Sequence, residues 1–249
     1  TEPTQPQGKE YPKLTSKSGT YSFYGSTPVC RVDNSAFDGY GYDNAVVSNY
    51  ATLINNFADE MDGDAKVYVL AIPTAIGIVL PDDIAAKMKG FENQNDRMET
   101  TFAKFSDKVT GINCYDNLMQ HRDEYLYFRT DHHWTGKGAY YASRYFLDTV
   151  GRSYPSLEAY DTFTYDTFLG SLYRHTQNLN LKNHPDYVEA YLSPTVSELT
   201  IFRDGIYQPR PLIDCEVSTT NKYLAFSSGD HEYYEAHNET ITDGSAILI

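Results

Sequence analysis

Basic side chains are scarce in this sequence of 249 residues, and long apolar runs are absent. Twenty Lys and Arg residues stand against 34 Asp and Glu residues, which gives a formal net charge of −14 at pH 7. A field of this sign repels phosphate backbones, so we expect no nucleic acid partner. The longest apolar run, residues 67–73, has the length of a strand. It falls far short of the roughly 20 residues that a membrane span needs.

Cysteine is also rare. Cys30, Cys114 and Cys215 are widely spaced and follow no metal-binding pattern. Three cysteines can form at most one disulfide, so they do not indicate whether the protein resides in a reducing or an oxidising compartment. The chain begins with the polar segment TEPTQPQGKE, which resembles the linker that remains when a signal peptide or membrane anchor is removed. A chain start chosen for recombinant expression would have the same polar composition. We expect an extracytoplasmic protein, secreted or held at the cell surface by such an anchor, with a flexible arm over residues 1–20.

The composition still supports a full core, because 41% of the residues are hydrophobic. The remaining residues, 21–249, have the length of one large α/β domain. Residues 42–61 place apolar side chains on one face of a helix. Residues 66–73 form a continuous apolar run typical of a buried parallel strand, and residues 109–115 indicate a second strand. This alternation predicts a parallel sheet flanked by helices.

Outside this alternation the pattern varies. Residues 21–32 indicate a short hairpin, and residues 196–207 indicate another around Asp204-Gly205. Residues 154–196 show no sustained period, and we interpret them as an irregular insert. Two further strands are expected, over residues 223–227 and 246–249.

The best candidate site is the segment of residues 129–136, RTDHHWTG. An aromatic extended segment precedes it, and a helix over residues 137–150 follows, with Thr135 as its predicted N-cap. In an extended chain Asp131 and His133 would face one side and His132 the other. An Asp beside a His can fix the tautomer of a general base, although a structural hydrogen bond near a helix start would look the same.

A metal site is the competing interpretation. Asp131, His132, His133 and the remote His231 offer carboxylate and imidazole ligands. The letters Asp-His-His also occur in a family of manganese phosphoesterases, which carry further aspartates after an early strand. Here that strand ends in residues 71–74, AIPT, without an acid. We therefore expect no metal and no other cofactor.

The longer context is more specific. Residues 124–145, EYLYFRTDHHWTGKGAYYASRY, resemble the signature of the bacterial DHHW proteins, which are similar to the alginate O-acetyltransferase proteins of the SGNH hydrolase superfamily. Residues 67–81 resemble the strand-to-Pro segment that precedes this signature in the family. Residues 168–173 (FLGSLY) and 223–231 (YLAFSSGDH) resemble later parts of the family pattern. The resemblance implies an SGNH-like parallel sheet, with the irregular insert after the DHHW helix.

The resemblance also implies roles for the residues of the motif. His133 matches the base of a Ser–His–Asp triad and Asp131 matches its orienting acid, whereas His132 occupies a variable position. Trp134 would pack under the site or simply in the core. Arg129 would bind Asp131 or a substrate group, or would only form an ion pair on the surface. The weaker candidates for substrate or oxyanion contacts are Arg129, His132, Trp134, Gly229, Asp230 and His231.

Two departures from the family pattern bear on catalysis. Asp230 stands where the family usually has Asn, and an ionised Asp cannot donate, so a backbone N–H would have to serve as the oxyanion contact. The family nucleophile follows a strand that residues 246–249 match, so we expect the serine just beyond Ile249, in a domain truncated at its C-terminus and inactive as it stands.

The function expected from these residues is an extracytoplasmic O-acyltransferase or acyl esterase of the SGNH type. Its partners would be a cell-envelope polysaccharide and an acyl donor. A non-catalytic glycan-binding module and a metal-dependent phosphoesterase remain as alternatives.

Overall fold

The computed structural model describes residues 10–18, 21–24, 27–61, 63, 65–88, 93–195 and 198–237. The chain divides into two compact units, each described below by itself. Unit 1 comprises Thr1–Ser153 and Gly170–His184, and unit 2 comprises Tyr154–Leu169 and Pro185–Ile249. That residues 21–249 form one domain stays a prediction.

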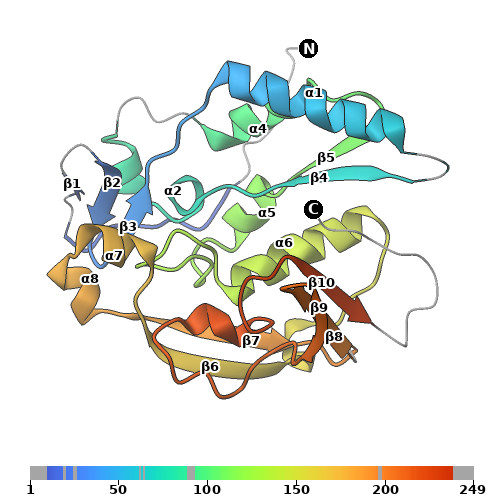
Figure 1. The fold of residues 1–249 in the computed structure, drawn as a ribbon. Coiled ribbons are helices and arrows are strands. Elements are labelled where there is room, and N and C mark those ends of the chain that lie inside the picture. The colour runs from blue at the N-terminus through green and yellow to red at the C-terminus, as the bar shows by residue number, and fades with distance from the viewer. Residues whose placement is uncertain are drawn as a thin grey trace, which may run out of the picture. The chain divides into compact units, whose positions relative to one another are not determined.

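Unit 1 contains most of the helices (Figure 1). Its elements are β1 (Tyr21–Tyr24), β2 (Thr27–Val32), β3 (Ser35–Asp38), α1 (Asn44–Glu60), β4 (Val67–Ala71), α2 (Ala75–Ile78), α3 (Asp82–Ala85), α4 (Gln94–Phe102), β5 (Val109–Asn113), α5 (Tyr115–Gln120), α6 (Gly136–Thr149), α7 (Ser171–Thr176) and α8 (Leu179–Asn183).

The predicted parallel pair is confirmed. β4 and β5 pair in parallel from Val67–Val109 to Ala71–Asn113. Helices α1 and α4 contact β5 on one side, and α6 contributes an edge-to-face contact between Phe146 and Tyr68 of β4. The other described sheets are antiparallel. The described residues therefore form a mixed α/β fold in which this pair is parallel, and the larger SGNH-like sheet is not shown.

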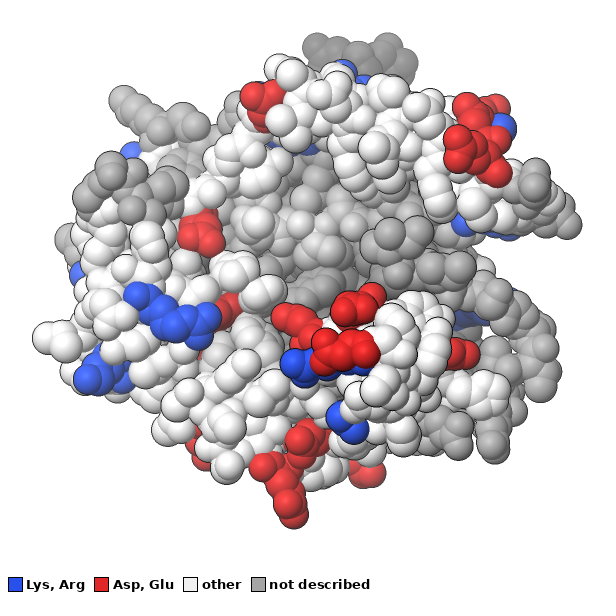
Figure 2. All heavy atoms as spheres, in the orientation of Figure 1, with Lys and Arg blue, Asp and Glu red and all other residues white. Residues whose placement is uncertain are grey.

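Helix α1 confirms the helix predicted over residues 42–61, and Asp43 caps it by accepting hydrogen bonds from the N–H groups of Ala45 and Val46. Its buried residues, however, are Ala51 and Ala58. The apolar stripe that predicted the helix is largely exposed, and Figure 2 shows this surface between acidic residues at the two helix ends. The exposed members of the stripe are Val46, Tyr50, Leu53 and Phe57.

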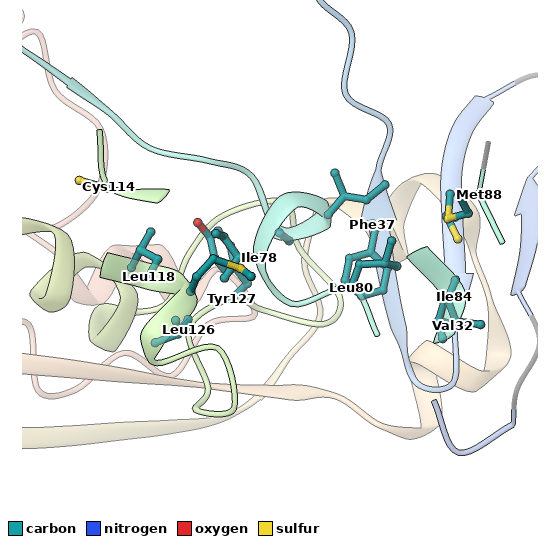
Figure 3. Packing of buried hydrophobic residues seen from close by; sticks show 14 of the residues in the cluster. Val32, Phe37, Ile78, Leu80, Ile84, Met88, Cys114, Leu118, Leu126 and Tyr127 are labelled. Atoms are coloured by element: carbon teal, nitrogen blue, oxygen red, sulfur yellow. The ribbon is translucent and has the colours of Figure 1, made fainter. Parts of the chain in front are cut away.

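The main core of unit 1 includes residues of the segment just before the candidate motif. Leu118, Ile78, Leu126 and Tyr127 belong to one buried cluster (Figure 3). Burial of each such large side chain contributes about 1.5–3 kcal/mol. The aromatic segment before the motif is therefore anchored in the core.

The hairpin predicted over residues 21–32 is confirmed as β1–β2, and β3 extends it to three strands. Within the predicted arm, residues 10–18 form hydrogen bonds with α3 of the same unit. The N–H of Leu14 donates to Asp82, and Ser16 donates to Asp83 through its N–H and its hydroxyl. The rest of that arm includes residues 1–9, which lie outside the described part.

Unit 2 contains η1 (Leu157–Ala159), β6 (Asp161–Phe168), β7 (Asp186–Leu192), β8 (Glu198–Arg203), β9 (Ile206–Arg210), η2 (Lys222–Ala225) and β10 (Tyr233–His237). The prediction of an irregular insert over residues 154–196 is wrong. Strands β6 and β7 pair antiparallel, with a register shift between Tyr165 and Phe168 that obscures the alternation in the sequence.

The hairpin predicted around Asp204-Gly205 is confirmed as β8–β9. Both turn residues have positive φ, 52° and 79°, as a type I′ turn requires. The strand predicted over residues 223–227 is wrong, because residues 222–225 form the 3₁₀ helix η2. The strand predicted over residues 246–249 lies outside the described residues. Within the described part, no helix is long and apolar enough to cross a membrane.

Candidate active site

The motif lies on a narrow loop of unit 1 whose two arms are held together by backbone hydrogen bonds. Tyr127 and Trp134 form an antiparallel bridge, and the N–H of Thr135 donates to the carbonyl of Leu126 at 2.8 Å. Thr135 also caps α6 through Gly138, as predicted. The hydroxyl of Tyr127 donates to the carbonyl of Pro73, just after β4. The loop is thus fixed beside the carboxyl end of a strand.

The tip of the loop is held by β3 and by the start of α7. The N–H of Ala36 donates to the carbonyl of Arg129 at 2.8 Å. Thr130 is fully buried; its hydroxyl accepts from the N–H of Gly170 at 3.1 Å and its carbonyl accepts from Tyr173 at 3.0 Å. These contacts fix the backbone on both sides of Asp131.

Asp131 and His133 make the predicted contact. The Oδ1 atom of Asp131 lies 2.7 Å from Nδ1 of His133 and also accepts from the His133 backbone N–H at 3.0 Å. Asp131 is only 1% exposed, whereas the His133 side chain is 50% exposed. An ionised carboxylate can only accept, so Nδ1 of His133 carries the hydrogen and its Nε2 is left as an acceptor. An exposed imidazole with this tautomer can act as a general base.

The prediction for His132 is wrong. Its ring does not face away but lies against the ring of His133, with centroids 3.9 Å apart. The expected alternation holds only for an extended strand, and residues 129–133 are a series of bends. Nδ1 of His132 is 2.5 Å from the hydroxyl oxygen of Ser171, so the two imidazoles share one side of the loop.

Asp131 has a second partner on α7. Its Oδ2 atom accepts from the N–H of Ser171 at 2.6 Å. Gly170 packs directly on the carboxyl group, because a Cβ at that position would lie 2.2 Å from the Asp131 Cβ. Residue types within the motif could not reveal Gly170 or Ser171, although the segment FLGSLY already resembled part of the family pattern. The carboxylate is therefore oriented from both sides.

A second acid, Asp38 at the end of β3, interacts electrostatically with His132. Burial raises the pKa of the Asp38 carboxyl, the positive fields of His132 and His175 oppose this shift, and the charge of Asp131 adds to it. Asp38 was not among the residues predicted from the sequence. Asp38 therefore adds a second carboxyl group to the surroundings of His132, beside that of Asp131.

The other motif residues have supporting positions. The Arg129 guanidinium carbon lies 5.7 Å from the centroid of the Tyr125 ring, within the range of a cation–π contact. Trp134 is partly buried and packs against the main core of unit 1. This position fits the interpretation of Trp134 as a core residue.

Three weaker candidates belong to unit 2. The N–H of Gly229, which has a φ of 106°, donates to the carbonyl of Phe226 at 2.9 Å, so it is engaged in a turn. Asp230 is exposed. Nε2 of His231 lies 3.1 Å from the carbonyl of Ser227. Their roles in oxyanion or substrate binding stay predictions.

The motif also has the composition of a small metal site. Asp131, His132 and His133 each offer one ligand atom, and these atoms lie within 4.8 Å of one another. The set fits a transition metal in residue type. Both carboxylate oxygens and both Nδ1 atoms, however, already have hydrogen-bonding partners. An ion bound through either Nδ1 atom would have to displace the hydrogen bond that this atom makes.

Comparison with known proteins supports the motif. One protein-family model, described as DHHW protein, matches residues 14–249. No curated protein matches the sequence. A crystal structure of a DHHW family protein from Eubacterium siraeum DSM 15702 is 26% identical with a TM-score of 0.78, covering 88% of this chain and 74% of that chain.

Two structures of Bacillus cereus PatB1 are also similar. One is 14% identical with a TM-score of 0.66 and covers 88% of this chain and 78% of that chain. The other, with a sulfonyl adduct, is 14% identical with a TM-score of 0.63 and covers 86% and 74%. Identities this low show a common fold alone.

Proposed function

The chain belongs to the DHHW protein family, and from the geometry of its motif we propose that it serves O-acyl transfer or acyl-ester hydrolysis. The acyl group would be carried by a polysaccharide of the cell envelope, outside the cytoplasm. The observation that carries the proposal is the 2.7 Å contact between buried Asp131 and exposed His133. The resemblance of the motif to O-acetyltransferase proteins supplies the reaction class.

The proposed reaction uses His133 twice. Nε2 of His133 takes the proton of a serine hydroxyl, whose oxygen attacks the carbonyl carbon of the acyl ester. The resulting imidazolium then gives this proton to the departing alcohol oxygen, leaving an acyl-serine. A sugar hydroxyl or water repeats the attack in the second half, and the serine recovers its hydrogen. Asp131 stays ionised throughout and stabilises the imidazolium.

The position of the loop supports an SGNH-like arrangement. Ligands of open parallel sheets bind outside the carboxyl ends of the strands. The loop contacts Pro73, which follows β4, and β4 pairs in parallel with β5. We infer that this pair belongs to a larger parallel sheet and that the nucleophilic serine comes from another of its strands.

The test uses the natural protein that contains this sequence. Acetate release from an O-acetylated polysaccharide and from 4-nitrophenyl acetate would be measured for wild type, D131N and H133Q. We expect both substitutions to lower kcat by about 10³- to 10⁴-fold while circular dichroism stays unchanged. H184Q, which alters the exposed histidine that caps the C-terminus of α8 and is bonded to the Asn180 carbonyl, is the matched control.

The outcomes separate the proposal from its alternatives. If H133Q retains more than a tenth of wild-type activity, His133 is not the base. A folded protein that binds the acetylated glycan but releases no acetate would instead be a glycan-binding module. Labelling by a sulfonyl fluoride followed by peptide mass spectrometry would identify the serine in an active enzyme.

The second candidate is a metal-dependent phosphoesterase, favoured by the closeness of the three possible ligands Asp131, His132 and His133. It would contain a stoichiometric transition metal and would hydrolyse phosphoesters. Elemental analysis of the purified protein and assays of 4-nitrophenyl phosphate with Mn²⁺ test it. We expect acyl release to survive dialysis against EDTA; its complete loss, restored by Mn²⁺, would replace our proposal.

A further inference from the structure

The acyl-transfer mechanism assigns no role to His132 or Ser171, yet the two are held together in the same loop cluster. Nδ1 of His132 lies 2.5 Å from the Ser171 hydroxyl oxygen. The His132 side chain is 48% exposed, close to the 50% of His133, and the two rings are in contact. A substrate that reaches the proposed base therefore also reaches His132.

The bonding capacity of the Ser171 hydroxyl indicates which group donates. A hydroxyl carries one hydrogen to donate, and its hydrogen bond among the described residues is the one to Nδ1 of His132. Donation from the Ser171 hydroxyl to Nδ1 of His132 satisfies this hydrogen, whereas the opposite direction would leave it without an acceptor in the described part of the chain. The carboxylate of Asp131, 3.9 Å from this nitrogen, would favour the opposite tautomer. The charge of Asp131, however, is already shared among three donors. These are the backbone N–H of His133, Nδ1 of His133 and the backbone N–H of Ser171.

A consequence follows for the outer nitrogens of the two rings. If Nδ1 of His132 accepts, its Nε2 must carry the hydrogen when the ring is neutral. His133 has the opposite tautomer, because Asp131 accepts from its Nδ1. One side of the loop would therefore present an acceptor on His133 and an N–H donor on His132 in adjacent rings.

We propose that Ser171 is a positioning residue that sets His132 as an Nε2–H donor, and that this donor binds an oxygen of the acyl ester while His133 handles the proton. The choice of an ester oxygen as the ligand rests on the proposed function. The tautomer itself does not, so it can be tested without any turnover.

Nuclear magnetic resonance of ¹⁵N-histidine-labelled protein reads the tautomers directly, in long-range ¹H–¹⁵N spectra at pH 8.5, above the ordinary histidine pKa of about 6.5. The chain supplies its own references. Nδ1 of His184 must donate to the Asn180 carbonyl, and Nε2 of His231 must donate to the Ser227 carbonyl. We expect His132 to match His231, and His133 to match His184.

Substitutions at position 171 then test the cause. S171A removes the hydroxyl but keeps the backbone N–H that binds Asp131. We expect it to shift the His132 tautomer ratio by about 3- to 10-fold, as one hydrogen bond would, and to leave the His133 pattern unchanged. S171T, which keeps a hydroxyl, should restore the wild-type ratio. The inference is overturned if wild-type His132 has the Nδ1–H tautomer, or if S171A leaves its ratio unchanged.

The ligand is tested by kinetics with 4-nitrophenyl acetate. If the Nε2–H of His132 binds the ester oxygen, S171A should raise KM by about 3- to 10-fold and change kcat by less than about twofold. H184Q should alter neither value. An unchanged KM in S171A would overturn the binding role of His132. If wild type shows no acyl release, the proposed function fails, and the tautomer spectra still decide the role of Ser171.

Discussion

Gly170 lies against the carboxyl group of Asp131 so closely that a Cβ at position 170 would be 2.2 Å from the Asp131 Cβ and 2.3 Å from its Oδ2. No side chain fits at these distances without a shift of the buried acid. The first helix residue after this glycine supplies the N–H that Asp131 accepts. The glycine thus permits the contact between α7 and the motif loop.

The variant G170A should therefore displace Asp131. We expect a loss of about 1–3 kcal/mol in the free energy of unfolding, measured by urea denaturation, because the site is overpacked. The ¹⁵N signals of the His133 ring should move toward a mixture of tautomers. G41A is the control, since nothing lies within 4 Å of a Cβ there. Wild-type stability together with unchanged His133 signals in G170A would contradict the close approach.

The sequence could predict the Asp131–His133 pair but not the residues that orient it. The pair lies within three positions of the chain, so residue types alone place it. Gly170 and Ser171 come 39 to 40 positions later, and they meet Asp131 only because α7 packs back on the loop. The orientation of His132 was mispredicted because the bends of the loop cancel the alternation of an extended strand.

Some elements of the fold could likewise be predicted from the sequence, and others could not. The β4–β5 pair was predictable because continuous apolar runs of strand length have few other interpretations. The β6–β7 pair could not be predicted in this way, because the register shift between Tyr165 and Phe168 interrupts the alternation of buried and exposed residues along β6. The exposed stripe of α1 shows that periodicity predicts a helix without predicting which face is buried.

Helix α1 provides a test of that last point. Leu53 is 67% exposed and Ala51 is 2% exposed. We expect L53K to change the free energy of unfolding by less than about 0.5 kcal/mol, as for ordinary surface substitutions. A51L should lower it by about 1–3 kcal/mol through overpacking. Urea denaturation with equal m-values measures both. A larger loss in L53K than in A51L would mean that the stripe is covered.

Arg122, which follows α5, provides a test of the contacts that hold the segment between α2 and α3. Its buried guanidinium donates at 2.8 Å to the carbonyls of Ile78 and Leu80 and to the carboxylate of Asp82. We expect R122M to lose about 3–5 kcal/mol of unfolding free energy, because it leaves buried acceptors without a donor. R203Q removes an exposed arginine of β8 and should lose less than about 0.5 kcal/mol. Equal effects of the two variants would contradict the structural role of Arg122.

Glu124 links the start of the motif segment to α6, and it predicts an acid dependence of stability. Its carboxylate accepts from the Tyr141 hydroxyl at 2.8 Å and contacts Nδ1 of His121 at 3.0 Å, and the ring of His121 stacks on that of Tyr141. Burial raises the pKa of Glu124, but the hydrogen bonds from Tyr141 and His121 together with the positive charge of Lys137 outweigh it and hold the pKa below its ordinary value.

A carboxyl whose pKa is lower in the folded state stabilises the protein above its unfolded pKa and loses this contribution as pH falls through the folded pKa. The difference in unfolding free energy between wild type and E124Q should therefore shrink as pH falls below about 4.5, the ordinary range of a glutamate. Y141F should weaken this dependence, because it removes the hydroxyl donor that lowers the pKa. Urea denaturation from pH 3 to pH 7 measures all three proteins, and a difference that grows toward pH 3 would show that Glu124 is bound in its protonated form.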